Sequence, residues 1–247
     1  LYSSAASDVY KRQILFLKGL FIGSTMTIPG VSGGTMAIIL GVYEDLIHNV
    51  NQIKKEPFKS VLFLCNIGLG GLIGFVAFAR VISYLLANPA TGIYVRVIFA
   101  IIVLCGIPLL VKKSGITKLS IVHILWLFLG LFLVLSLSII PKGLFASGSG
   151  LSFIIMQFLG GIIVAIALVL PGISASHMLY ILGLYTTVLE NVYTFKWLSL
   201  IPLLLGIIIG TFATANVLER LINKYTENTY MVIIGFVMGS VVGLFGG

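Results

Sequence analysis

The chain has 247 residues, of which 59% are hydrophobic and only 9% are charged. Soluble domains carry about 25% charged residues, so this composition excludes a soluble globular domain and predicts a membrane protein. The formal net charge is +8, but the basic residues are scattered in short loops, which indicates membrane topology and contact with anionic membrane lipids rather than nucleic-acid binding.

The first thirteen residues, LYSSAASDVYKRQ, are treated separately. They contain no initiator Met, no apolar core and no cleavage-site pattern, so they do not form a signal peptide. They resemble translated vector sequence, and we interpret residues 1–13 as a non-native leader outside the fold.

Apolar segments divide the rest of the chain. Residues 14–28 are too short to cross about 30 Å of hydrocarbon, which needs about 20 residues. They end at Pro29-Gly30-Val31-Ser32, and a second short apolar run follows at 36–47. Spanning helices are predicted at 61–86, 92–111 and 119–140. The early pattern then returns, with residues 151–170, the motif Pro171-Gly172-Ile173-Ser174, a short run at 178–192, and spanning helices at 197–218 and 229–245.

This return is an internal repeat. Residues 29–50 align with residues 171–192 at a constant offset of 142, and ten of the 22 aligned residues are identical. After a loop of different length, Gly70 and Gly74 align with Gly206 and Gly210, a spacing of small residues that suits close helix packing. We therefore predict a duplicated all-α membrane protein.

Each short helix, Pro-Gly break and short helix forms either one discontinuous spanning helix or a re-entrant hairpin, and loop charges distinguish the two. With hairpins at 14–50 and 151–192, nine basic residues fall on one side: Lys18, Lys54, Lys55, Lys59, Lys112, Lys113, Lys118, Arg220 and Lys224. Only Lys142 and Lys196 fall on the other side. The positive-inside rule then favours re-entrant hairpins with cytoplasmic basic loops.

This topology makes the two repeats inverted, as in many secondary transporters. Repeat one covers 14–111, with its hairpin and two transmembrane helices. Residues 119–140 form a linking helix. Repeat two covers 151–247, again with a hairpin and two transmembrane helices. The two Pro-Gly breaks are then expected to meet near the membrane midplane.

The breaks are the predicted ligand site. Helix N-termini present free N–H groups, glycine allows close approach to the backbone, and Ser and Thr add donors, which together suit a phosphate. The candidate substrate-binding residues are Pro29, Gly30, Ser32, Gly33, Gly34, Thr35, Arg80, Pro171, Gly172, Ser174, Ser176 and His177. The alternative is that the hydroxyl groups only cap short helices, and capping is expected in either case.

Each charged residue near the apolar segments has either a functional or a structural interpretation. Arg80 either pairs with phosphate, or with Glu44 or Glu190, or extends to the headgroups. Glu44 and Glu190 are candidates for carrying a coupling ion, a proton or sodium, or are hydrated helix ends. His177 either titrates or binds phosphate, or is structural.

The segment Gly30-Val31-Ser32-Gly33-Gly34 also matches the G-x-S-x-G motif of hydrolases. That motif requires a strand–turn–helix in an α/β sheet, and Pro-Gly-x-Ser occurs twice where a hydrolase needs one nucleophile. We therefore expect a protein that is not an enzyme. No cluster at ligand spacing predicts a metal site, and no cofactor is predicted.

The two motifs resemble those of a bacterial undecaprenyl-phosphate translocase family, in PGVSGGTMAIILGVYEDLI at 29–47 and ALVLPGISASHMLYILGLYTTVLE at 167–190. The resemblance extends from Lys18 to the end of the chain. The matching residues are Pro29, Gly30, Ser32, Gly33, Gly34, Thr35, Glu44, Arg80, Pro171, Gly172, Ser174, Ser176 and Tyr185. Ala175 replaces an expected Gly, and His177 an expected bulky apolar residue.

This resemblance implies a multi-pass flippase of the bacterial inner membrane that returns the lipid carrier of cell-wall polymers to the cytoplasmic leaflet. The substrate is then a lipid phosphate, and no oligomeric state is implied. The alternatives are a secondary transporter of a small anion and a structural or chaperone-like membrane partner.

Overall fold

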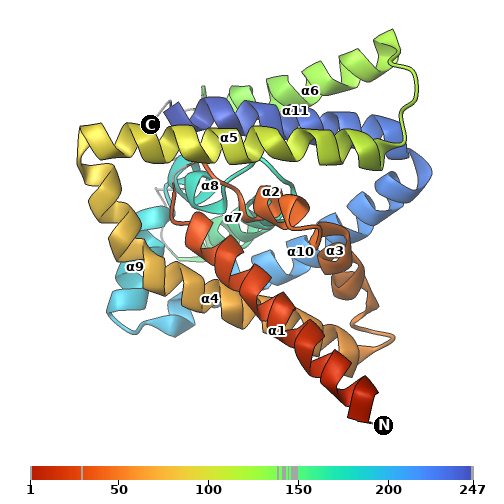
Figure 1. The fold of residues 1–247 in the computed structure, drawn as a ribbon. Helices are drawn as coiled ribbons and strands as arrows, with labels where there is room; N and C mark the ends of the chain where they lie inside the picture. The colour runs from red at the N-terminus through yellow and green to blue at the C-terminus, as the bar shows by residue number, and fades with distance from the viewer. Residues whose placement is uncertain are drawn as a thin grey trace.

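The computed structural model describes residues 2–28, 30–137, 139–140, 143, 145 and 150–245, so Pro29 and Lys142 lie outside the described residues. Within these ranges the regular structure is entirely helical (Figure 1). The helices of the first half are α1 (Tyr2–Thr25), α2 (Gly33–Ile39), α3 (Tyr43–Gln52), α4 (Pro57–Ala87), α5 (Pro89–Ser114) and α6 (Ile121–Leu137). Those of the second half are α7 (Leu151–Val169), α8 (Ala175–Leu182), α9 (Tyr185–Tyr193), η1 (Trp197–Leu200), α10 (Ile201–Lys224) and α11 (Thr226–Phe245).

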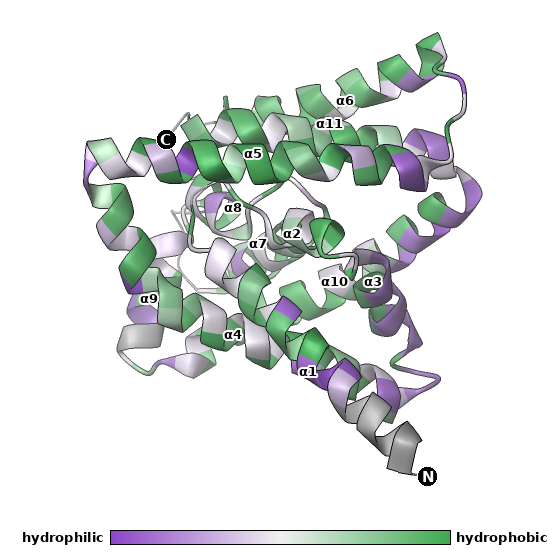
Figure 2. Ribbon diagram, viewed as in Figure 1, coloured by the Kyte–Doolittle hydropathy of each residue, from purple (hydrophilic) through white to green (hydrophobic). Residues whose placement is uncertain are grey.

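Five helices are long and apolar enough to cross a membrane, namely α4, α5, α7, α11 and the continuous segment of η1 and α10. Their exposed faces carry many large apolar side chains, and Figure 2 shows that most residues along these helices are hydrophobic. Since such faces are stable only against lipid, the chain is a multi-pass membrane protein. The apolar helix α6 has 17 residues and is shorter than the predicted segment 119–140. Backbone helix α1 also includes residues 2–13, which the sequence analysis set apart as a leader.

Glycines let the long helices pack backbone to backbone. On α1 and α4, a Cβ added at Gly19, Gly23, Gly70 or Gly74 would overlap backbone atoms of the other helix. The same holds in the second half, where Gly161 of α7 faces α10 and Gly206 faces α7. The repeated small residues therefore build the same parallel helix pair twice, α1 with α4 and α7 with α10.

The segment after each Pro-Gly break differs from the prediction of one short helix. Gly41 and Gly183 adopt left-handed φ values of 69° and 75° and divide the segments into α2 and α3, and into α8 and α9. Val42 N donates to Ala37 O at 2.9 Å, and Leu184 N donates to Leu179 O at 3.0 Å. These six-to-one bonds are Schellman motifs, which end a helix at glycine. In the Gly-x-Tyr motif that the two repeats share, the glycine ends one helix and the tyrosine begins the next.

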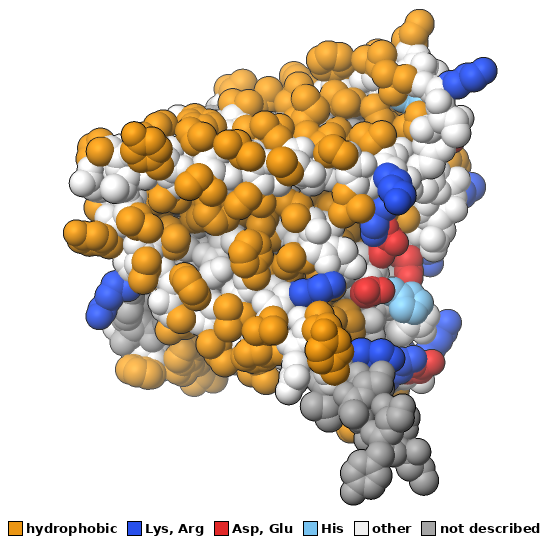
Figure 3. Space-filling model, viewed as in Figure 1, with side chains coloured by type: hydrophobic (Ala, Val, Ile, Leu, Met, Phe, Trp, Pro, Cys, Tyr) orange, Lys and Arg blue, Asp and Glu red, His pale blue; other side chains and the backbone are white. Residues whose placement is uncertain are grey.

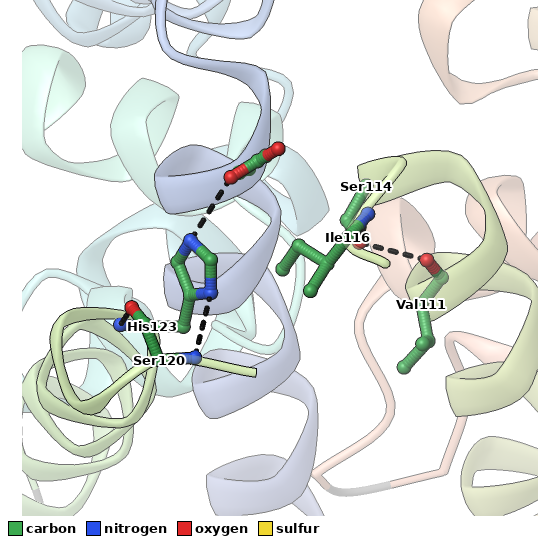
Figure 4. A network of polar contacts seen from close by, with 6 residues as sticks. Val111, Ser114, Ile116, Ser120 and His123 are labelled. Atoms are coloured by element: carbon green, nitrogen blue, oxygen red, sulfur yellow. Dashed lines mark hydrogen bonds and ion pairs between the residues drawn. The ribbon is translucent and has the colours of Figure 1, made fainter. Parts of the chain in front are cut away.

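Charged residues gather along one edge of the molecule, on the right of Figure 3. There Lys113 at the end of α5 pairs with Glu44 of α3 at 2.8 Å, and His48 of α3 contacts Glu219 of α10 at 3.0 Å. His123 of α6 joins the same edge, since its Nε2 lies 3.0 Å from Glu227 Oε2 of α11. Ser120 N donates to His123 Nδ1 at 3.3 Å, and both residues are labelled in Figure 4. The ends of five helices thus form one polar end, which we call the basic end.

Candidate functional site

The two Pro-Gly breaks lie against each other in the middle of the fold. We call residues 30–35 the first turn and residues 170–177 the second turn. Gly172 N donates a hydrogen bond of 2.9 Å to Thr35 Oγ1, across 137 residues of sequence. A Cβ on Gly34 would lie 3.2 Å from Pro171 Cα, so the two backbones are in direct contact. The structure therefore brings together the two motifs that the sequence analysis aligned.

Helix α11 supports both turns from behind. Gly30 and Gly172 adopt left-handed φ values of 86° and 81°, which only glycine adopts without strain. A Cβ on Gly30 would lie 3.0 Å from Leu244 N, and one on Gly172 would overlap the Phe236 carbonyl. Gly30, Thr35, Pro171 and Gly172 consequently act in packing and in joining the turns, since none of them lines the cavity described next.

A cavity of about 350 Å³ lies beside the meeting point of the turns. Both turns contribute its polar wall, through Ser32, Gly33 and Gly34 of the first turn and Ser174 and Ser176 of the second. Apolar side chains of α1, α3, α7 and α10 make up most of the remaining wall, among them Ile22, Ile47, Ala167 and Ala215. Such a cavity suits a small polar or anionic group that is attached to an apolar chain.

The hydroxyl groups do not cap the helices, contrary to the expectation from sequence. Ser32 and Ser174 stand at the N-cap positions of α2 and α8, yet neither side chain makes a capping hydrogen bond. Ser32 is only 3% exposed, lines the cavity, and forms no side-chain hydrogen bond with the described residues. Ser174 Oγ lies 2.9 Å from Ser176 Oγ instead. The capping prediction is therefore wrong for both residues, and the Ser32 hydroxyl remains available to a ligand.

Helix α2 has only seven residues because of the Schellman stop after it. A helix of two turns aligns few peptide dipoles, so the macrodipole assumed from the longer run 36–47 is weaker than expected. Any anion in the cavity would therefore depend mainly on hydroxyl groups and on local backbone N–H groups.

Four further predicted residues do not line the cavity either. Arg80 is exposed on α4 and forms no hydrogen bond or ion pair with the described residues. His177 is exposed on α8, and Glu190 is exposed on α9. Glu44 lies at the basic end, where its Oε1 accepts hydrogen bonds from Lys113 Nζ and from the Tyr230 hydroxyl. Pro29, the remaining predicted residue, lies outside the described residues.

The charge state of Glu44 follows from these contacts. Burial alone would raise the pKa of Glu44, but the hydrogen bonds from Lys113 and Tyr230 and the charge of Lys113 outweigh it, so the pKa lies below its ordinary value. Glu44 is therefore ionised at neutral pH and ties α3 to α5 and α11.

Most of the lining residues were not among the predicted site residues, and three of them are informative. Tyr43 lines the cavity, and its hydroxyl donates to Val169 O at 2.8 Å, which joins α3 to α7. Phe75 of α4 and Thr211 of α10 line the wall behind the turns. Tyr43 belongs to the repeated Gly-x-Tyr, so the repeat itself was the available signal. Phe75 and Thr211 directly follow the paired glycines Gly74 and Gly210. The described residues contain no group of three or more His, Cys, Asp and Glu side chains placed to hold a metal ion.

The comparison with protein families agrees with this architecture. Residues 22–246 match the family model described as "VCA0040-like: Undecaprenyl phosphate translocase-like". The chain belongs to this family. The matched residues include both turns and all five candidate spanning helices, so family membership covers the site as well as the scaffold.

Two curated relatives in the comparison are named polyprenyl-phosphate transporter. The protein from Staphylococcus aureus is 30% identical, covering 95% of this chain and 86% of its own length. The protein from Vibrio cholerae is 29% identical, covering 91% of this chain and 75% of its own length. No solved structure matches the chain.

Proposed function

We propose that this protein transports polyprenyl phosphate across the membrane, with the phosphate held in the cavity between the first and second turns. The observation that carries the proposal is Ser32, a buried residue that lines the cavity and whose hydroxyl forms no hydrogen bond with the described residues, on the same cavity as Ser174 and Ser176. A phosphate monoester accepts hydrogen bonds from all three hydroxyl groups, and such charge-assisted bonds are among the strong ones. Membership in the family and the names of both relatives support the same substrate class.

The apolar wall favours a lipid over a free ion. Desolvating an anion is costly, and the described residues that line the cavity include no lysine or arginine to offset that cost. A polyprenyl chain contributes favourable burial against side chains such as Ile22, Leu46 and Ile47 that a small anion lacks. The chain length proposed is that of undecaprenyl phosphate, the carrier lipid of cell-wall polymers, and the proposed direction is return to the cytoplasmic leaflet of the inner membrane.

The proposed mechanism is alternating access by two inverted repeats. In support, α3 leads into α4 at the basic end, where α3 also contacts Glu219. Helix α9 leads through η1 into Ile201, which lies 18 residues before Glu219 along α10, or about 27 Å at 1.5 Å per residue. The two hairpins thus return toward opposite ends of the helix bundle, and the basic end is proposed to be cytoplasmic. The proposed driving force is a proton or sodium gradient, or mass action.

The topology is tested by thiol labelling in intact cells after Cys65 and Cys105 are replaced by serine. Lys54→Cys and Lys196→Cys then provide one thiol each at the two loops. The proposal expects that a membrane-impermeant reagent labels only the Lys196→Cys variant from outside. Labelling of both variants from the same side would exclude inverted hairpins.

The site is tested by leaflet transfer of labelled polyprenyl phosphate in proteoliposomes. The double variant Ser32→Ala, Ser174→Ala removes two donors to a charged group, each worth about 1.5–3 kcal/mol, so the rate should fall at least about tenfold. Ser240→Ala is the matched control, since Ser240 is also buried but donates to Val237 O, away from the cavity. An unchanged rate in the double variant would refute the site.

Two further outcomes distinguish other functions. Transport that soluble phosphate or sulfate inhibits, and that lipid phosphates do not, would indicate a small-anion transporter. If neither class of ligand changes the thermal stability of the protein, a structural role replaces transport.

A further inference from the structure

A second cavity lies on the far side of the second turn. It has a volume of about 540 Å³ and is enclosed by α6, α10 and α11. Its walls are almost wholly apolar, with Trp126 and Leu129 of α6, Leu218 and Leu221 of α10, and Val232 and Phe236 of α11. Polar groups occur at one end only, where Tyr225, Asn228 and Thr229 form a rim at the α10–α11 corner. We call this cavity the lateral crevice.

The crevice is elongated rather than round. Its lining runs along α11 from Thr229 to Phe236 and includes Tyr225 just before that helix. From Tyr225 to Phe236 is eleven residues, or about 16 Å of helix. An apolar slot of this length with one polar end has the form of an acyl chain below a headgroup, and Trp126 and Leu221 remain about 40% exposed along it. A chain can therefore enter from the side, through the lipid-facing surface.

The polar end of the crevice has two cations that form no ion pair with a carboxylate of the described residues. Lys224 Nζ lies 5.2 Å from the centre of the Tyr225 ring, and Tyr225 lines the rim. Arg220 is one turn earlier on α10. Neither residue pairs with a carboxylate of the described residues, and both are exposed.

The two nearby carboxylates contact side chains of other helices and not these cations. Glu219 contacts His48 at 3.0 Å and accepts a hydrogen bond of 2.6 Å from Asn51. Glu227 contacts His123 at 3.0 Å. The corner therefore offers two cations, and the rim adds the Asn228 amide, which forms no hydrogen bond with the described residues.

We propose that the lateral crevice is a binding site for an anionic phospholipid that is not the transported substrate. One acyl chain occupies the apolar slot, and the phosphate lies at Lys224, Arg220 and Asn228. Basic residues near a membrane surface each favour an anionic headgroup by about 1 kcal/mol, or about fivefold in affinity. The crevice also reaches Leu170, which directly precedes Pro171, so the bound chain contacts the back of the second turn.

The fluorescence of Trp126 can report binding at this site. The sequence has two tryptophans, and Trp197→Phe leaves Trp126, which lines the crevice, as the only one. Bromine atoms on an acyl chain quench tryptophan fluorescence at short range. The experiment compares quenching of Trp126 by dibrominated phosphatidylglycerol and by dibrominated phosphatidylcholine at equal mole fractions. The proposal expects an apparent affinity at least about fivefold higher for phosphatidylglycerol.

Two charge variants in the same background locate the headgroup. Lys224→Ala with Arg220→Ala should bring the phosphatidylglycerol affinity down to that of phosphatidylcholine. Lys54→Ala with Lys55→Ala removes the same charge from another loop at the basic end and should leave the preference intact.

Three outcomes would overturn the proposal. Equal quenching by both lipids in the Trp197→Phe protein itself would show bulk lipid only, and this test needs no charge variant. An equal loss of preference in the two double variants would show general attraction to the basic end. Displacement of the brominated lipid by equimolar polyprenyl phosphate would make the crevice part of the substrate path. Leaflet transfer is measured separately, so failure here leaves the proposed function untouched.

Discussion

The first and second turns share one sequence pattern but occupy different surroundings. In the first turn, Ser32 and Thr35 are 3% and 1% exposed, and Thr35 joins the two turns. In the second turn, Ser176 and His177 are exposed, and the residue aligned with Thr35 is His177. Helix α3 lines the cavity and contacts α10, whereas no described residue of α9 lines it. Duplication thus provides two similar hairpins, and unequal packing makes the first the tighter half of the site.

The largest effect is expected from breaking the helix pair behind either hairpin. Gly74→Leu places a side chain into the backbone of α1, and Gly210→Leu places one into α7. Each should destabilise the fold by about 3 kcal/mol or more, because neither backbone can move aside. Gly68→Leu is the control on α4, since nothing lies within 4 Å of its added Cβ. Size-exclusion profiles and melting curves in detergent measure the result, and a Gly74→Leu protein that behaves like Gly68→Leu would contradict the packing.

The next effect separates the two turns in transport. Ser32→Ala removes a buried hydroxyl that has no substitute nearby, so leaflet transfer should fall about tenfold. Ser174→Ala should lower it less, because Ser176 Oγ lies 2.9 Å away and can replace the lost donor. Transfer rates of the two single variants at equal protein density measure the difference. A larger loss for Ser174→Ala would reverse the comparison between the turns.

The contact between the turns is tested by Thr35→Val, which keeps the shape of the side chain and removes the acceptor of the Gly172 N–H. A buried N–H without a partner costs about 1–3 kcal/mol, so the melting temperature should fall by several degrees. Thr35→Ser retains the hydroxyl and should recover most of that loss. Equal melting temperatures for Thr35→Val and the wild type would show that the bond does not hold the turns together.

The smallest effect concerns the ion pair between Glu44 and Lys113, which holds α3 to α5. Among the described contacts, α9 has no corresponding ion pair. The pKa of Glu44 is lowered in the folded state, so its stabilising contribution is present above the unfolded value of about 4.5. This contribution is lost as the pH falls through the lower folded value. Glu44→Gln should flatten the dependence of melting temperature on pH below about 4.5 and change little at pH 7 beyond the loss of one exposed pair. If the melting temperature of Glu44→Gln depends on pH below about 4.5 as that of the wild type does, Lys113 does not stabilise the Glu44 carboxylate.

The repeat and its meeting point follow from the sequence, because Pro-Gly-x-Ser and the glycine spacing encode local backbone geometry. The sequence analysis did not predict that each short run after a Pro-Gly break divides into two helices. Gly41 and Gly183 are the signal for this division, but apolar residues continue across both glycines. The capping prediction failed because a hydroxyl rotamer depends on neighbours from other helices. Thr211 and Phe75 enter the cavity only through helix packing, and for the same reason the sequence did not place Arg80 outside it.

The most direct test is a structure of the protein with polyprenyl phosphate bound. We predict a phosphate oxygen within about 3 Å of Ser32 Oγ, and another within the same distance of the Ser174 or Ser176 hydroxyl. A phosphate bound outside the cavity, with these three hydroxyl groups unoccupied, would contradict this prediction.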